Sequence, residues 1–364
     1  MLNVPLGFDG MKPHILFTGG GTAGHVTPNL ALIHAARARG WQVSYVGSAQ
    51  GIEHEMVQAQ QVPYFAVASG KLRRYFDWQN FIDPFKLLLG VCQAFVLCLR
   101  LKPDVVFSKG GFVSVPVVVA AWLTRIPVIS HESDVTPGLA NRLAYPFCRR
   151  ICLTFEVSRR HLPEAKVLLT GTPVRNTITS GEARRGREAL GLNGVKPVLL
   201  VFGGSLGAGA INRQVRAVLP ELLATFDVVH VAGRGNIDPS LAQSDYVQRE
   251  FIGDEFGDVL AAADVVVSRA GANSLYELFL LRKPHLLIPL GSGASRGDQL
   301  VNAATFEQAG YSRVIQEAAL TDAGFVSAVQ DLLTDAEQLS EAMSSFPRPD
   351  SERMILAEIE QYCA

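Results

Sequence analysis

The stretch HILFTGGGTAGHV, residues 14–26, decides how the first part of the chain folds. The apolar run 15–17 predicts a buried parallel strand, and the apolar spacing over 30–36 predicts a helix, so the glycines form a strand-to-helix turn. Such turns favour anions, because glycine lets the backbone approach closely and a helix N-terminus offers unpaired N–H groups. A plain tight turn is the alternative, but it does not account for His25. The spacing is neither the dinucleotide-binding G-x-G-x-x-G nor a P-loop, which needs a Lys.

The length and composition bound the class of protein. A chain of 364 residues with 48% hydrophobic residues predicts about two globular domains. The start of the chain shows neither a basic region nor a long apolar one, so we expect no signal peptide and a cytoplasmic location. No C-x-x-C pair occurs, which indicates reduced thiols at the five cysteines, Cys92, Cys98, Cys148, Cys152 and Cys363.

The net charge of −1 hides an asymmetry between the halves of the chain. Residues 1–175 carry a net charge of +8, and residues 176–364 carry −9. A basic first half favours an anionic partner. We expect a membrane surface and no nucleic acid, because the sequence contains no nucleic-acid motif.

Short apolar runs alternate with amphipathic stretches along the whole chain. This alternation predicts βαβ units with parallel sheets covered on both faces, and therefore an α/β protein with two doubly wound, Rossmann-like domains. The strands expected in the first half are 14–18, 42–47, 64–68, 103–111, 126–133 and 150–155. Those expected in the second half are 196–208, 227–233, 249–253 (REFIG), 263–271 and 284–290.

The two openings PHILFTGGGTAGH and PVLLVFGGSLGAGAIN each run from an apolar strand through glycines into a helix, as two similar domains would. The expected domains are 1–175 and 176–345, with the linker near 171–186. A break at FPRPDSER precedes an apolar-periodic helix over 352–363. We expect the last segment, 346–364, to pack back on the first domain.

Residues 71–102 combine cations, aromatics and an apolar run. The apolar core 87–99 has 13 residues and includes Gln93, so it is too short to span a bilayer, and a buried helix is the favoured interpretation. The part before it mixes cations with interfacial aromatics, which suits an anionic membrane surface and leaves peripheral membrane contact open. These residues are Lys71, Arg73, Arg74, Tyr75, Phe76, Trp78, Phe81, Ile82 and Phe85.

The residues able to do chemistry lie in loops after the expected strands, where open α/β sheets bind ligands. In SRAGANSLYE, Glu277 follows a glycine turn that opens a helix. Its carboxylate can cap that helix or accept hydrogen bonds from a ribose diol, and the nearby glycine loops favour the diol. The loops are SKGGFVS (108–114), HESD (131–134), TGTPVR (170–175), FGGSLGA (202–208), FIG (251–253), SRAGANSLYE (268–277) and SRGDQ (295–299).

Seven of these motifs, in this order and at these separations, resemble the MurG family of bacterial N-acetylglucosaminyltransferases. They are GGGTAGH, SKGGFVS, HESD, GTPVR, GGSLGA, SRAGANSLYE and Asp298-Gln299 followed by Asn302-Ala303. The resemblance covers roughly residues 12–340. It implies a GT-B fold with two domains facing across a cleft, UDP-N-acetylglucosamine held mainly by the second domain, and a lipid-linked acceptor, lipid I, held by the first. It also implies peripheral attachment to the cytoplasmic side of the cell membrane.

Residue by residue, the resemblance implies a donor site with named roles. Glu277 binds the ribose, Ser205 and its glycines bind the diphosphate, and Ile252 contacts uracil through its backbone. Two positions depart from the pattern: Ala23 stands where some relatives have Gly, and Asp134 stands where others have Asn. The implied substrate-binding residues are Thr22, Ala23, Gly24, Asp134, Arg175, Ser205, Ile252, Ala272, Asn273, Ser274, Leu275, Tyr276, Glu277 and Gln299.

The implied reaction inverts the configuration at the anomeric carbon of the donor sugar in one step, and it requires a base. The candidates are His25, which we expect to point into the cleft, and Glu132 of HESD. N–H groups of GGSLGA, with Arg175, would stabilise the departing diphosphate. The sequence has no clear D-x-D motif, so neither a metal nor a cofactor is expected. A transferase for another lipid acceptor, a non-catalytic UDP-sugar-binding protein and a UDP-sugar epimerase are the alternatives.

Overall fold

The structure is a computed structural model that describes residues 12–70, 79–204, 207–291 and 297–363. For residues 79–82 it describes the backbone. The chain forms two compact units. Unit 1 runs to Pro173 and takes back the end of the chain from Pro349. Unit 2 runs from Val174 to Arg348 and also includes the short segment Asp134–Thr136.

Unit 1 is built on a seven-stranded parallel sheet in the order β3-β2-β1-β4-β5-β6-β7. Its strands are β1 (His14–Thr18), β2 (Gln42–Gly47), β3 (Tyr64–Ala66), β4 (Val105–Ser108), β5 (Val128–Glu132), β6 (Arg150–Leu153) and β7 (Val167–Leu169). Its helices are α1 (Ala23–Ala38), α2 (Ile52–Gln58), α3 (Gln79–Leu101), α4 (Ser114–Leu123), α5 (Leu139–Ala144) and α15 (Ser351–Glu360), with 3₁₀ turns η1 (Tyr145–Phe147), η2 (Glu156–His161) and η3 (Glu164–Lys166).

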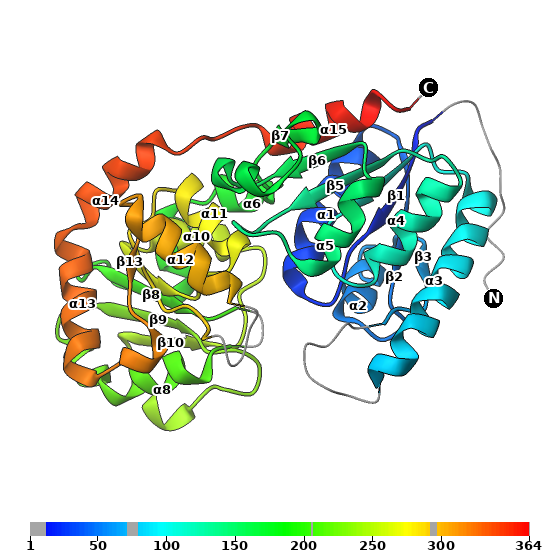
Figure 1. The fold of residues 1–364 in the computed structure, drawn as a ribbon. Helices are drawn as coiled ribbons and strands as arrows, with labels where there is room; N and C mark the ends of the chain where they lie inside the picture. The colour runs from blue at the N-terminus through cyan, green and yellow to red at the C-terminus, as the bar shows by residue number, and fades with distance from the viewer. Residues whose placement is uncertain (1–11, 71–78, 205–206, 292–296, 364) are drawn as a thin grey trace. The chain divides into compact units, whose positions relative to one another are not determined.

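Helices cover both faces of this sheet (Figure 1). Successive side chains of a strand point to opposite faces, so Ile15 and Phe17 join one core with α1, α2 and α15. Leu16 joins the other core with α3, α4 and α5. Burial of both faces explains why this strand is apolar at consecutive positions and not at alternate ones.

Unit 2 repeats the scheme with a six-stranded parallel sheet in the order β10-β9-β8-β11-β12-β13. Its strands are β8 (Val198–Phe202), β9 (Asp227–Val231), β10 (Tyr246–Arg249), β11 (Val265–Ser268), β12 (His285–Leu287) and β13 (Arg313–Val314). Its helices are α6 (Asn176–Thr179), α7 (Ala183–Leu190), α8 (Gly209–Ala217), α9 (Leu219–Leu223), α10 (Phe256–Ala262), α11 (Ala272–Leu280), α12 (Asp298–Gln308), α13 (Asp322–Thr334) and α14 (Ala336–Ala342), with η4 (Pro239–Leu241), η5 (Glu317–Ala319) and η6 (Met343–Ser345).

The two doubly wound sheets confirm the expected fold class, but one strand prediction was wrong and two strands were missed. The strand expected at 249–253 lies earlier, at β10, because Tyr246 and Val247 are the buried pair while Phe251 is exposed. The short edge strands β7 and β13 were not predicted. An edge strand pairs on one side only, so it needs less apolar sequence than a central strand.

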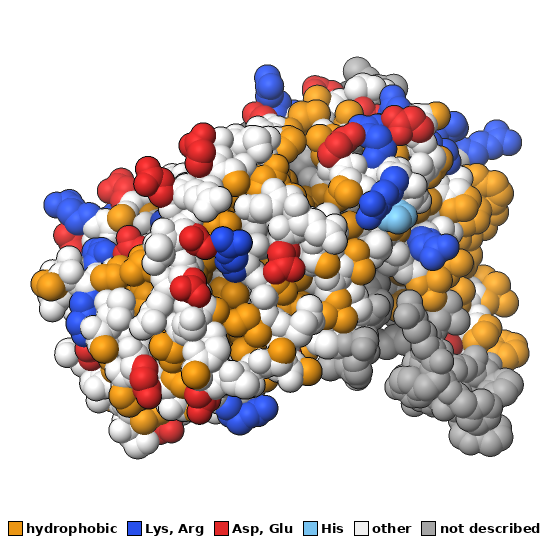
Figure 2. All heavy atoms as spheres, turned by 60° about the vertical axis from the view of Figure 1, so that its left-hand side comes forward, with side chains coloured by type: hydrophobic (Ala, Val, Ile, Leu, Met, Phe, Trp, Pro, Cys, Tyr) orange, Lys and Arg blue, Asp and Glu red, His pale blue; other side chains and the backbone are white. Residues whose placement is uncertain are grey.

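Helix α3 corrects the prediction of a buried helix over 87–99. It has 23 residues, and only one of its faces, with Ala94 and Cys98, packs into the core of unit 1. The other face exposes Phe85, Leu88, Leu89, Val96 and Leu99. By length and composition, the segment Asp83–Leu101 could cross a membrane, and little of it is buried. In the face of the molecule drawn in Figure 2, hydrophobic side chains gather along the right-hand edge.

The last helix, α15, completes the core of unit 1. The side chain of Asp350 accepts the N–H of Arg353 and caps the helix start. Ile355, Leu356 and Ile359 are fully buried in the core cluster that includes α1.

Truncation of the α15 core should therefore destabilise unit 1. We expect Leu356→Ala to lower the free energy of unfolding by about 2–5 kcal/mol, the usual cost of a cavity left by leucine. Chemical denaturation measures this, with Arg353→Ala, an exposed residue of the same helix, as the control that changes it by less than about 1 kcal/mol. Equal effects of the two changes would contradict the core role of α15.

Candidate functional site

The glycine turn after β1 binds a carboxylate of the chain itself. Gly21 has φ +86°, a left-handed conformation that suits glycine. Its N–H donates to Oε2 of Glu53 at 3.1 Å, and the N–H of Gly20 donates to the carbonyl of Gly110 at 3.3 Å. The sequence predicted an anion at this turn, but at Gly21 the anion is internal. Glu53 was not predicted as part of this site, because it lies in α2, whose sequence has an ordinary helical pattern.

Glu53 is buried, with 1% of its surface exposed, and is well provided with donors. Its Oε1 accepts the N–H of Ser48 at 3.1 Å and the hydroxyl of Ser48 at 2.6 Å. Burial alone would raise the pKa of this carboxyl, but the hydrogen bonds from Ser48 and Gly21 outweigh it, and the pKa lies below its ordinary value. The carboxylate is therefore ionised at neutral pH.

His25 lies in the first turn of α1, partly exposed, and its orientation is fixed from the turn. Its Nδ1 is 2.9 Å from the carbonyl oxygen of Gly20 and 3.2 Å from Oγ1 of Thr22. A carbonyl can only accept, so Nδ1 carries the hydrogen in that bond. In the neutral ring, the lone pair is then on Nε2, the nitrogen able to take a proton.

Glu132, the second candidate base, organises its own loop. It is 3% exposed, and its carboxylate accepts hydrogen bonds from the N–H groups of Ser133 and Gly138, from Asn141 and, at 2.6 Å, from the hydroxyl of Tyr145. Burial, followed by the Glu132 charge, raises the pKa of Tyr145. Through these four donors, one carboxylate ties the end of β5 to α5 and η1.

A buried lysine, also missed from the sequence, joins three loops of unit 1. Lys109 follows β4, and its Nζ lies 2.7 Å from Nδ1 of His131, 2.5 Å from Oγ of Ser133 and 3.2 Å from Oγ1 of Thr172. His131 Nε2 donates to the carbonyl of Gly171 at 2.8 Å. Burial and then the Lys109 charge hold the pKa of His131 well below its usual value, so this imidazole is neutral.

The last residue of HESD belongs with unit 2. Oδ1 of Asp134 accepts from Nδ2 of Asn302 at 3.1 Å, and Oδ1 of Asn302 accepts the N–H of Val135 at 3.1 Å. Asn302 is fully buried in α12 and also donates to the carbonyl of Ala270, just before α11. Asp134 thus joins the loops of unit 2, although the sequence placed it within the first domain.

The glycine loop after β8 requires its glycines. Gly204 and Gly207 have φ +100° and +77°. A Cβ at Gly207 would lie 2.2 Å from the carbonyl oxygen of Ala232. The loop therefore packs closely against the end of β9 before α8 begins at Gly209. Ser205 lies outside the described residues.

Helix α11 contains the predicted binding residues 272–277, of which some are partly exposed to solvent and the others are buried. Leu275 and Tyr276 are fully buried, and Tyr276 contacts Phe346 edge-on with ring centroids 5.9 Å apart. Their side chains pack the core. The partly exposed members of the run are Asn273, Ser274 and Glu277, and Ala272 is buried.

Glu277 does not cap α11. The helix begins at Ala272 after Gly271, with no side-chain cap, and Glu277 lies in its second turn. Burial raises the pKa of the Glu277 carboxyl to about 7, while the Arg175 charge acts in the opposite direction. Arg175 itself pairs with Asp254 at 3.3 Å. A carboxylate poor in donors is suited to accept them from a ligand.

Two further predicted residues support unit 2 locally. The side chain of Ile252 is buried in the core, which leaves its backbone as the part suited to a ligand. Oε1 of Gln299 accepts the N–H of Leu290 at 3.0 Å and ties α12 to the segment after β12. In unit 1, Thr22 and Gly24 are exposed and Ala23 is partly exposed, at the start of α1.

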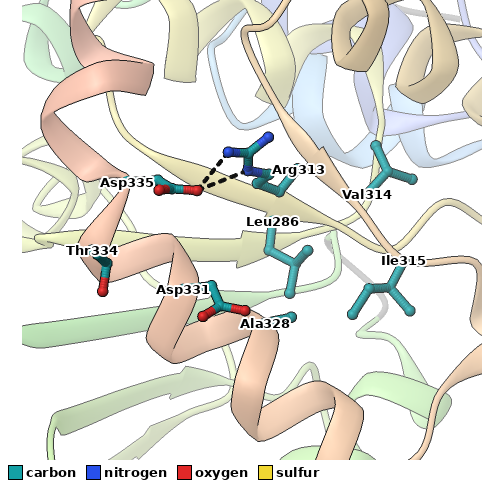
Figure 3. A pocket seen from close by; sticks show the side chains of 8 residues that line it. All are labelled: Leu286, Arg313, Val314, Ile315, Ala328, Asp331, Thr334 and Asp335. Atoms are coloured by element: carbon teal, nitrogen blue, oxygen red, sulfur yellow. Dashed lines mark hydrogen bonds and ion pairs between the residues drawn. The ribbon is translucent and has the colours of Figure 1, made fainter.

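A pocket of about 340 Å³ lies elsewhere on unit 2, against α13 and β13 (Figure 3). Leu286 and Ile315 contribute apolar side chains, and Arg313 pairs with Asp335 beside them. None of the predicted site residues lines it. Among the described residues, no group of three or more His, Cys, Asp or Glu side chains could hold a metal ion.

Two doubly wound units with glycine loops after β1 and β8 form the arrangement expected of a GT-B fold, and comparison with family models identifies the class as a glycosyltransferase. Residues 15–153 match the N-terminal domain of glycosyltransferase family 28, and residues 198–355 match its C-terminal domain. The chain belongs to glycosyltransferase family 28.

Its similar curated proteins have one name in common, UDP-N-acetylglucosamine–N-acetylmuramyl-(pentapeptide) pyrophosphoryl-undecaprenol N-acetylglucosamine transferase. The protein of Legionella pneumophila (strain Paris) is 50% identical over 353 residues, covering 96% of this chain and 97% of its own. That of Geobacillus kaustophilus is 51% identical over 352 residues, covering 96% and 99%.

Solved structures agree on the fold. Acinetobacter baumannii MurG has a TM-score of 0.75 at 23% identity and covers 96% of this chain and 99% of its own. CalG4, the calicheamicin glycosyltransferase, has a TM-score of 0.69 at 16% identity, covering 96% and 98%.

A ribose bound by Glu277 would make donor binding dependent on pH, because the pKa of this carboxyl is raised. Only the ionised carboxylate can accept two ribose hydroxyls, so the affinity for UDP-N-acetylglucosamine should rise about tenfold from pH 6 to pH 8 as a group with a pKa of about 7 ionises. This donor has no group of its own that titrates in that range, and isothermal titration calorimetry measures its affinity.

Glu277→Ala should weaken binding and abolish this pH dependence, and it should also reduce the thermal protection given by UDP. Glu341→Gln, an exposed acid of α14, is the control. Equal protection of the wild type and Glu277→Ala would remove Glu277 from the site.

Proposed function

We propose that this protein transfers N-acetylglucosamine from UDP-N-acetylglucosamine to the N-acetylmuramyl unit of pyrophosphoryl-undecaprenol N-acetylmuramyl-pentapeptide, lipid I, to give lipid II for peptidoglycan synthesis. The observation that carries this proposal is the similarity, at about half identity and over 96% of the chain, to transferases named for that donor and acceptor. Family 28 domains in both halves of the chain support it.

Unit 2 provides the donor site in this proposal. Glu277 accepts the ribose hydroxyls, the backbone of Ile252 contacts uracil, and the loop after β8 binds the diphosphate, with Ser205 among its residues. Arg175, whose charge acts on Glu277, contributes positive potential at the same end of unit 2. Gln299 and Asn302 hold the segments around this site in place.

Unit 1 provides the base. The acceptor hydroxyl oxygen forms a bond to the anomeric carbon while the bond from that carbon to the diphosphate oxygen breaks. The hydroxyl proton passes to Nε2 of His25, the nitrogen with the lone pair when Nδ1 donates to Gly20. N–H groups of the loop after β8 and of α8, together with Arg175, stabilise the negative charge that develops on UDP. Glu132 shapes the neighbouring loop.

A lipid-linked acceptor requires access to a membrane, and α3 supports peripheral attachment at its cytoplasmic side. Phe85, Leu88 and Val96 of α3 are more than 60% exposed, as apolar groups that enter a membrane interface would be. The net charge of +8 on residues 1–175 adds attraction to anionic lipids. Lys71, Arg73 and Arg74, outside the described residues, precede this helix in the sequence.

Removal of the base should abolish most of the transfer. We expect His25→Ala to lower kcat about a hundredfold or more, the scale of general-base loss, and to leave donor affinity within a few-fold. Transfer of labelled N-acetylglucosamine from its UDP donor to a lipid I analogue measures this. His34→Ala, an exposed histidine of the same helix, should behave as wild type.

Near-normal turnover of folded His25→Ala would exclude His25 as the base. A large loss of donor affinity with little change in turnover at saturation would place His25 in the donor site. Absence of transfer by the wild-type protein to the lipid I analogue would contradict the proposed reaction itself.

The exposed face of α3 should mediate binding to anionic vesicles. We expect the double variant Leu88→Ser with Leu89→Ser to weaken vesicle binding at least about tenfold, because each leucine loses apolar burial in the interface. Sedimentation with phosphatidylglycerol vesicles measures this. Val195→Ser, which changes an exposed residue of unit 2, should have no effect.

The contribution of cations to vesicle binding can be measured separately, through its dependence on salt. Binding should weaken with salt, and replacement of Lys71, Arg73 and Arg74 by Ala should reduce it by about 1 kcal/mol per cation. Salt-independent binding, or unchanged binding of the α3 double variant, would contradict this attachment.

A further inference from the structure

Glu53 and His25 bind the two sides of one peptide group. The carbonyl oxygen of Gly20 accepts Nδ1–H of His25 at 2.9 Å, and the N–H of Gly21, in the same peptide unit, donates to Oε2 of Glu53 at 3.1 Å. An ionised carboxylate, a peptide and an imidazole therefore form one line of hydrogen bonds. The reaction proposed above uses His25 and leaves Glu53 without a role.

A hydrogen bond to a carboxylate polarises the peptide that donates it. Electron density moves toward the carbonyl oxygen, which becomes a stronger acceptor, and such chains reinforce one another in a low dielectric. The gain is larger for the charged imidazolium than for neutral imidazole, because a bond from a charged donor is about twice as strong. The arrangement follows the base-and-orienting-acid pattern of hydrolytic triads, with a peptide placed between the two side chains.

The protein gives this carboxylate a dedicated space. A Cβ added at Gly20 would lie 2.5 Å from Cδ of Glu53, and one at Gly51 would lie 2.2 Å from its Oε1. At Gly47 the distance to Cγ of Glu53 would be 2.9 Å. Gly20 after β1 and the pair Gly47 and Gly51 at the β2–α2 connection thus leave room for this buried side chain, and Gly47 also leaves room for the hydroxyl of Tyr64. Within the first motif, this contact accounts for the glycine at position 20.

Other titratable groups face this region from the neighbouring elements. Tyr45 of β2 donates to the carbonyl of Gly19, and Tyr64 of β3 donates to that of Ser48. Burial raises the pKa of both phenols, so both stay neutral. After β4, Lys109 packs its Cβ against Gly19, while its charged Nζ is hydrogen-bonded to His131 and Ser133.

Against α1, helix α15 brings its acidic Glu360 to Arg39, just beyond the other end of α1 from His25.

We propose that Glu53 is a positioning residue that acts through the Gly20–Gly21 peptide, fixes His25 as the Nδ1–H tautomer and raises the basicity of its Nε2. The effect on turnover rests on the proposed function of His25. The effect on the His25 ring does not, because it follows from the hydrogen bonds alone.

Glu53→Gln tests this role, because it keeps the volume of the side chain and removes its charge. We expect kcat to fall about tenfold with KM for UDP-N-acetylglucosamine within about twofold, as expected when a base is weakened and binding is not. The acidic limb of the pH profile of kcat/KM should move about 0.5–1 unit to lower pH, because His25 without the carboxylate is easier to deprotonate. Glu55→Gln, two residues along the same helix and exposed, should match the wild type.

A purely structural Glu53 gives a different result. Glu53→Gln would then lower thermal stability, and with it the amount of active enzyme, while the pH profile stays in place. An unmoved acidic limb, or kcat equal to that of the wild type, overturns the proposal.

Ring titration of His25 by NMR gives a readout independent of turnover. The pKa of His25 should be about 0.5–1 unit lower in Glu53→Gln than in the wild type, even if His25 proves not to be the base. If Glu53→Gln does not fold, Ser48→Ala provides the second variant. It removes the 2.6 Å hydroxyl donor from Oε1 and concentrates the charge of Glu53 on its remaining bonds, so the pKa of His25 should rise by about 0.3 unit. An unchanged His25 pKa in these variants overturns the proposal.

Discussion

The glycine turn after β1, and with it the orientation of His25, depends on the buried carboxylate of Glu53. An ionised carboxylate in a protein interior costs several kcal/mol unless donors surround it. Two donors from Ser48 and one from Gly21 meet this requirement, and glycines at three positions make room for it. The hydrogen bond to Glu53 therefore fixes the turn after β1, and the hydrogen bond from His25 to that turn fixes the orientation of the imidazole.

Two glutamates of the protein show opposite pKa shifts for one physical reason. Glu53 is surrounded by backbone and hydroxyl donors, so its pKa is lowered in spite of burial. For Glu277, burial is the main influence and outweighs the opposing charge of Arg175, so its pKa rises to about 7. The first suits a fixed charge that supports a loop. The second suits a group whose donors arrive with the ligand.

Local pattern was enough to predict much of this fold, and long-range contacts account for what it missed. The central strands could be predicted from short apolar runs, because a strand buried on both faces of a sheet needs apolar residues at consecutive positions. The glycine turns could be predicted because their glycines come directly after such runs. Glu53 was hidden in IEHEMVQ, an ordinary helical pattern, because its partners come from two other segments. The pairing of Asp134 with Asn302 spans 168 residues, and α3 could not be assigned a buried or exposed face without its neighbours.

The central claim, that the turn fixes His25 with its proton on Nδ1, is tested most directly by nitrogen-15 NMR. The wild-type protein, labelled at its histidine ring nitrogens, is observed above the pKa of His25, with His25→Ala used to assign its signals. We expect a protonated, pyrrole-type shift for Nδ1 and an unprotonated, pyridine-type shift for Nε2. The opposite assignment, or the averaged shifts of a freely exchanging ring, would contradict it.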